Sequence, residues 1–100
     1  MTSELKLGVL ALLEAKPEKA AELAAFLESG RALAEAEPGT VTWYAFRTGE
    51  TTFGIFDTFA TDDARQAHLT GEIAKALGEV APDLLAAEPD FRLIDLLAAK

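Results

Sequence analysis

The sequence contains no cysteine, no asparagine and one histidine. Without cysteine, disulfides, thiolate catalysis and iron–sulfur ligation are excluded, and we expect a reducing cytoplasm as the compartment. A lone histidine cannot build a histidine-rich metal site, and no segment has the spacing of a calcium loop, so we expect neither a metal nor another cofactor. The chain also lacks the run of about 20 apolar residues that a membrane-spanning helix needs.

Basic residues are scarce, since nine lysines and arginines stand against 17 aspartates and glutamates, for a net charge of −8. This balance repels a phosphate backbone, and no basic patch interrupts it, so we expect no nucleic-acid partner. The length of 100 residues, half of them apolar, predicts a single domain over residues 1–100.

Two neighbouring segments, Val41–Phe46 and Phe53–Phe59, are apolar on both alternating faces. An antiparallel strand with one solvated face alternates between apolar and polar residues instead. The two expected helices can cover one face of a small sheet, so the second face needs another cover. The pattern therefore predicts a homodimer that joins the uncovered sheet faces and encloses space for a small molecule.

Periodicity predicts the element order strand, helix, strand, strand, helix, strand. A right-handed crossover on each side of a central hairpin gives an antiparallel sheet of order 4-1-3-2 with both helices on one face. This is the ferredoxin-like α+β arrangement. The expected segments are Leu5–Leu13, 17–33, Thr40–Thr48, Thr51–Phe59, 61–80 and Phe91–Leu97.

The hairpin carries a specific expectation about register. Gly49-Glu50 suits a two-residue type II′ turn. That turn places Tyr44 opposite Ile55 and Thr42 opposite Asp57, with Trp43 on the other face. It also places Gly54 opposite Ala45, where the missing side chain would open a gap.

The chain resembles the antibiotic biosynthesis monooxygenase family of dimeric α+β barrels. The resemblance rests on Glu37-Pro38-Gly39 before the second strand, on Tyr44, on Phe56-Asp57-Thr58-Phe59, and on Ala64 followed by His68. It implies a pocket between sheet and helices, and some relatives oxidise anthrones or quinols with molecular oxygen and no cofactor, while others degrade haem. The chain departs from the family pattern in having Asp57 where glutamate is more usual, Glu72 or a neighbour where a second histidine is often found, and no asparagine.

His68 is the candidate general base, because its unperturbed pKa lies near neutrality. Asp57 is the candidate carboxylate that orients His68 or a substrate hydroxyl. The structural alternatives are a His68 that bonds a backbone carbonyl, and an Asp57 paired with an arginine: Arg47, Arg65 or Arg92.

Tyr44 and Trp43 are the candidate substrate-binding aromatics, because their O–H and N–H need partners when buried. Arg65 is a candidate to steady an oxyanion, with a solvated side chain as the alternative. Together with the family resemblance, these residues favour a cofactor-independent monooxygenase acting on a small phenolic or quinol-like aromatic. The alternatives are a protein that binds a small hydrophobic ligand without turnover, and a purely structural dimer with a filled interior.

Overall fold

The computed structural model describes residues 5–100. The first four residues of the expected domain lie outside the described part. The described residues form a four-stranded antiparallel sheet of order β2-β3-β1-β4. The strands are β1 (Leu7–Glu14), β2 (Thr40–Arg47), β3 (Thr52–Phe59) and β4 (Asp90–Asp95). The predicted order and the ferredoxin-like fold class are confirmed.

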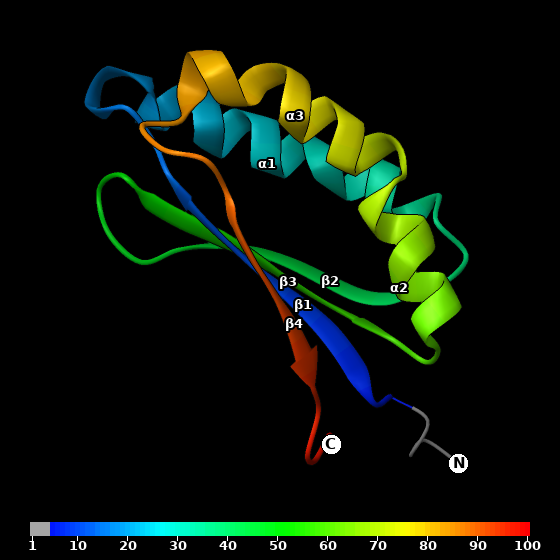
Figure 1. Cartoon of the computed structure of the whole chain (residues 1–100). Coiled ribbons are helices and arrows are strands. Elements are labelled where there is room, and N and C mark those ends of the chain that lie inside the picture. Colours follow the sequence, from blue (N-terminus) through cyan, green and yellow to red (C-terminus); the bar gives the residue numbers. More distant parts are fainter. Residues whose placement is uncertain (1–4) are drawn as a thin grey trace.

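The helices are α1 (Ala20–Glu35), α2 (Asp62–Leu69) and α3 (Glu72–Leu84), and a short 3-10 helix, η2 (Pro17–Lys19), leads into α1. Figure 1 shows α1 and α3 side by side over one face of the sheet, with α2 over the end of the same face. Both helical segments therefore lie on one side, as the sequence predicts.

The core lies in the layer between the sheet and α1 and α3. From β1 it takes Val9, Ala11 and Leu13, all at most 3 % exposed. The helices contribute Leu23 and Leu77, which stand on their inward faces. Burying a side chain of this size stabilises the fold by about 1.5–3 kcal/mol, so this layer fixes the distance between helices and sheet.

The hairpin register differs from the prediction by one residue. Trp43 lies opposite Asp57, and Tyr44 lies opposite Phe56. The connection is longer than a two-residue turn, because the Thr48 N–H donates to the Thr52 carbonyl. A slip of one residue exchanges the two faces of a strand, so Trp43 faces the helices and Tyr44 faces away.

The expected gap at Gly54 is filled. Gly54 lies opposite Phe46, not Ala45. A Cβ atom at Gly54 would lie 2.6 Å from Phe46 Cε1, so the aromatic ring occupies the space that glycine leaves.

The second helical segment begins where the sequence predicts, and it is broken into two helices. Thr61 is the N-cap of α2, and its hydroxyl accepts a hydrogen bond from the Ala64 N–H at 3.1 Å. Gly71 separates α2 from α3. The break leaves α2 packed on the sheet as a piece of its own.

The sheet face opposite the helices carries apolar side chains. Tyr44 is 58 % exposed on this face, and Leu10 and Phe56 on neighbouring strands are partly buried. Within residues 5–100, no helix is both long enough and apolar enough to cross a bilayer.

Candidate functional site

A cavity of about 320 Å³ lies between the sheet and the helices. Its sheet wall includes Val9 and Ile55, and its helical wall includes Leu27, Gly30 and Leu77. An apolar cavity of about 150 Å³ is enough to bind benzene, so this one has room for a fused pair of rings. The expected alternative of a completely filled interior does not agree with this cavity.

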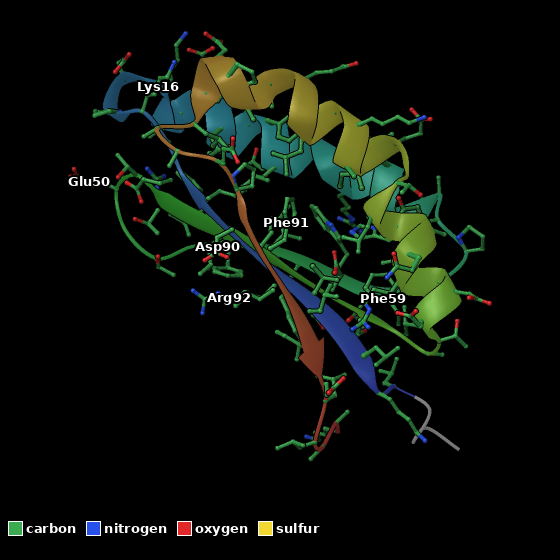
Figure 2. All side chains as sticks on the ribbon, in the orientation of Figure 1. Lys16, Glu50, Phe59, Asp90, Phe91 and Arg92 are labelled. Atoms are coloured by element: carbon green, nitrogen blue, oxygen red, sulfur yellow. The ribbon has the colours of Figure 1, made fainter. Side chains whose placement is uncertain are left out.

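Strand β4 forms the edge of the cavity. Figure 2 shows Phe91 on the side of β4 that faces the helices, and Arg92 on the opposite side. Phe91 and Leu93 line the cavity, yet they are 50 % and 58 % exposed. These apolar side chains therefore border an opening toward solvent along β4.

Gly30 on α1 allows the helix to approach the sheet closely. A Cβ atom at this position would lie 3.1 Å from Ile73 Cδ1 and 3.4 Å from the Trp43 ring. The indole of Trp43 therefore packs directly under α1 at the cavity wall.

His68 lies at the cavity wall between two carboxylates. Its Nε2 is 2.9 Å from Asp57 Oδ2, and its Nδ1 is 2.6 Å from Glu37 Oε1. An ionised carboxylate only accepts hydrogen bonds, so both ring nitrogens donate when His68 is protonated. The ring of Phe59 covers the imidazole with 5.2 Å between ring centroids.

The surroundings of His68 act on its pKa in opposite directions. Burial lowers the pKa, because it disfavours the charged imidazolium, while the hydrogen bonds and charges of Asp57 and Glu37 raise it. The net result is a pKa of His68 above its usual value. His68 is therefore more strongly protonated in the fold than a free histidine.

Glu37 is held in place from two sides. The Thr40 hydroxyl donates to Glu37 Oε1 at 2.7 Å. Gly71 leaves room for the other oxygen, because a Cβ atom there would lie 2.9 Å from Glu37 Oε2. The segment between α1 and β2 thus places a carboxylate next to the break between α2 and α3.

Two polar atoms of cavity-lining residues have no hydrogen-bond partner among residues 5–100: Asp57 Oδ1 and Trp43 Nε1. A buried polar atom without a partner costs about 1–3 kcal/mol. Asp57 and Trp43 are direct neighbours across β3 and β2. Two neighbouring residues of the cavity wall, on adjacent strands, therefore carry a buried acceptor and a buried donor without partners.

The structure brings three of the predicted site residues to the cavity: His68, Asp57 and Trp43. Tyr44 stands on the opposite face of the sheet, because of the register described above. Arg65 does not line the cavity within the described part of the chain.

Arg65 is buried and not solvated, contrary to the alternative considered from sequence. Its guanidinium donates to the Gly8 and Ile94 carbonyls at 3.4 and 3.3 Å, and to Asp62 Oδ1 at 3.0 Å. These bonds tie α2 to β1 and β4.

The arginine partners considered for Asp57 are also engaged elsewhere. Arg47 donates to the carbonyls of Gly49 and Glu50, and Arg92 donates to Asp90. The prediction of an Asp57–arginine pair is therefore wrong, and so is the alternative in which His68 bonds a backbone carbonyl. Among residues 5–100, no group of three or more histidine, cysteine, aspartate or glutamate side chains is arranged to hold a metal ion.

Glu37 is the site residue that sequence reasoning missed. Its place follows from topology: Thr40 pairs with Phe59, and α2 begins at Asp62. The segment before β2 and the first turns of α2 must therefore lie next to each other. A carboxylate three residues before Thr40 was the available signal.

Comparison with solved structures finds many proteins that share this fold. A protein of unknown function from Nitrosomonas europaea is 49 % identical over 97 % of this chain and 94 % of that chain, with a TM-score of 0.95. A protein from Caulobacter crescentus, described as a candidate antibiotic biosynthesis monooxygenase, is 26 % identical over 94 % of this chain and 92 % of its own, with a TM-score of 0.81.

A protein from Pseudomonas aeruginosa shares the fold at 21 % identity and a TM-score of 0.81, over 94 % of this chain and 96 % of its own. No curated protein matches the chain. The family pattern described as antibiotic biosynthesis monooxygenase matches residues 7–79, which include β1, α1, the hairpin, α2 and the first part of α3. This chain therefore belongs to the antibiotic biosynthesis monooxygenase family.

Proposed function

We propose that this protein binds a small, neutral aromatic molecule that carries a hydroxyl group, and oxidises it with molecular oxygen without a bound cofactor. The observation that carries the proposal is the apolar cavity with the His68–Asp57 pair in its wall. Apolar walls suit an aromatic ring, and a hydroxyl group suits the unused Asp57 oxygen.

Charge supports a neutral ligand. No lysine or arginine is found among the described residues that line the cavity. A carboxylate or phosphate on the ligand would meet Asp57 without a cationic partner, apart from a His68 already bonded to two carboxylates. The cavity therefore disfavours anionic ligands.

The proposed reaction is a monooxygenation that balances with dioxygen alone. A methylene or aromatic C–H carbon para to the hydroxyl becomes a carbonyl, as when a phenol becomes a quinone. One oxygen atom enters the ring, and the other leaves as water with two hydrogens of the ligand. The ligand supplies all four electrons, because an electron-rich phenolate transfers electrons to oxygen directly. Together, His68 and Asp57 move the hydroxyl proton.

Oxygen uptake with a panel of phenols, naphthols and anthrones that carry hydrogen on the carbon para to the hydroxyl tests this proposal. We expect uptake with wild-type protein, and a loss of at least about 100-fold in His68→Gln and Asp57→Asn. Asp95→Asn, an exposed strand position, is the matched control. Circular dichroism must show that the variants stay folded. Absence of uptake on every compound would refute the oxygenase assignment.

A second candidate function is binding without turnover. It is favoured by the small number of polar groups in the described cavity wall and by the absence of asparagine from the sequence. A hydroxyaromatic compound that raises the melting temperature, but consumes no oxygen, would support this candidate, since a ligand that binds only the folded state stabilises it.

We also propose a homodimer through the sheet face that the helices leave uncovered. Its support is the set of apolar side chains there, including Tyr44, Leu10 and Phe56. Exposed patches of this kind often mark protein interfaces. Light scattering at micromolar concentration should give twice the chain mass, and Tyr44→Glu should reduce it. A monomeric wild-type mass would exclude this dimer.

A further inference from the structure

We propose that Asp57 is the group that contacts the ligand hydroxyl, and that Glu37 is the positioning residue that holds His68 behind it. This inference rests on the proposed function only for the identity of the ligand. It reassigns the direct acid–base role from His68 to Asp57, and it gives Glu37 a role that sequence reasoning did not assign.

The hydrogen bonds of the imidazole argue for this order. Both ring nitrogens of His68 are occupied, by Asp57 Oδ2 at 2.9 Å and by Glu37 Oε1 at 2.6 Å. A ring bonded at both nitrogens has no lone pair to offer a ligand. Two carboxylate oxygens of these groups have no partner in residues 5–100, Asp57 Oδ1 and Glu37 Oε2. Of these two residues, Asp57 lines the described cavity and Glu37 does not, so Asp57 Oδ1 is the acceptor nearer to a ligand.

Burial supports the same order. Side-chain exposure rises along the three groups, from 1 % for Asp57 to 9 % for His68 and 19 % for Glu37. The carboxylate at the cavity is thus the least hydrated of the three. Such a carboxylate needs a charged partner to stay ionised, and His68 supplies one.

Contacts within the fold hold the Glu37 carboxylate next to His68. Thr40 donates to the same oxygen that bonds His68, at 2.7 Å. The carboxylate also occupies the space left by the missing side chain of Gly71. Glu37 and Asp57 are the titratable groups in contact with His68, one from the segment before β2 and one from β3.

A carboxylate is a strong enough base for this reaction. A phenol that gives up an electron becomes a strong acid, so its proton moves as the electron leaves for oxygen. The ligand O–H bond breaks, the proton passes to Asp57 Oδ1, and the bonding electron pair stays on the ligand oxygen. His68 keeps its own proton throughout and stabilises the carboxylate.

The single histidine of the sequence makes the role of Glu37 directly measurable. In a tag-free protein, long-range ¹H–¹⁵N spectra report one imidazole ring. In Glu37→Gln we expect His68 to lose its proton at a lower pH than in wild type, because one of the two negative charges that stabilise the imidazolium is gone. Glu35→Gln, an exposed α1 position, is the control and should leave the titration unchanged.

The role of Asp57 is tested by binding, independently of turnover. The probes are 1-naphthol and its methyl ether, followed through the indole N–H signal of Trp43, the one tryptophan of the sequence. Wild-type protein should prefer the naphthol by on the order of tenfold, as expected for a hydrogen bond to a charged acceptor. Asp57→Asn should lose most of this preference, whereas Glu35→Gln should retain it.

Two results would overturn the inference. One is a His68 titration in Glu37→Gln that matches wild type. The other is an unchanged preference for naphthol in Asp57→Asn. Both readouts work in a protein that consumes no oxygen, so a failed oxygenase assignment is distinguishable from a failed assignment of these residues. If oxygen uptake is found, its pH profile in Glu37→Gln should shift in the same direction as the His68 titration.

Discussion

Removal of Asp57 should destabilise the fold strongly. The side chain is 1 % exposed and contributes one of the two carboxylates that bond the buried imidazole. Breaking a buried ion pair by removing one partner costs about 3–5 kcal/mol. Because Glu37 still holds the other ring nitrogen, we expect Asp57→Ala to cost about 3 kcal/mol, near the lower end of that range.

This loss is large on the scale of a 100-residue domain. About 1 kcal/mol shifts the melting temperature of such a domain by about 4–8 °C, so Asp57→Ala should lower the midpoint by about 12–24 °C. The assay is thermal unfolding followed by circular dichroism at pH 6, with urea unfolding to give the free energy. Protein concentration is held constant, because dimer formation would add to the stability.

Two variants separate charge from shape. Asp57→Asn keeps the side-chain volume and removes the charge, so most of the loss should remain. Asp95→Ala, an exposed aspartate on β4, should change stability by less than about 0.5 kcal/mol. A wild-type midpoint in Asp57→Ala would refute the reasoning, since it would mean that the carboxylate contributes nothing to the packing of His68.

Three further predictions concern His68 and two glycines. The pKa of His68 is higher in the folded protein than its usual value, so the folded protein binds this proton more tightly than the unfolded chain does. The resulting contribution to the free energy of unfolding is complete below the unfolded pKa of about 6.5. It disappears as the pH rises through the pKa of the folded protein. Urea unfolding from pH 5.5 to 9 should show that the free energy of unfolding declines in wild type and not in His68→Gln. The same dependence of this free energy on pH in the two proteins would contradict the prediction. Gly39→Ala should destabilise by about 1–3 kcal/mol, because its Cβ would lie 2.7 Å from the Ala64 Cβ and would push α2 away from β2. Gly78→Ala in α3 should instead stabilise the fold by up to about 1 kcal/mol, since no atom lies within 4 Å of the added Cβ. Similar unfolding midpoints in the two alanine variants would show that the close approach at Gly39 does not affect stability.

The strand order and the placement of the helices could be predicted from sequence, because both depend on patterns that extend over many residues. Pro17 begins the short helix that leads into α1, Thr61 is the N-cap of α2, and Gly71 lies between α2 and α3. Apolar runs on both faces of the hairpin identified its strands. These signals accumulate along an element, so one ambiguous residue does not change the result.

The hairpin register could not be predicted, because it depends on the length of a single turn. A two-residue turn at Gly49-Glu50 and the longer connection observed differ by one residue of pairing. That difference moved Trp43 into the cavity wall and Tyr44 out of it. The sequence contains apolar residues at both alternations, so burial did not distinguish the two registers.

The sequence identified two residues of the candidate site and missed a third, whose position depends on strand pairing. His68 and Asp57 carry chemistry that singles them out, and the structure places them in contact. Glu37 entered the sequence analysis only as part of the Glu37-Pro38-Gly39 marker, without a role in the site, and it is one of many glutamates in an acidic chain. Its contact with His68 spans 31 positions of sequence and depends on the pairing of β2 with β3.

The break at Gly71 has a consequence for how this protein can change over evolution. His68 stands on α2, which Arg65 bonds to the backbone of β1 and β4, while α1 and α3 form the roof of the cavity. Backbone carbonyls remain when side chains are substituted, so the Arg65 hydrogen bonds that hold α2 are compatible with side-chain substitutions in β1 and β4. Substitutions in the roof, at Leu27 or Leu77, can reshape the cavity without moving the imidazole. A fold built in this way can accommodate different ligands while the imidazole keeps its position.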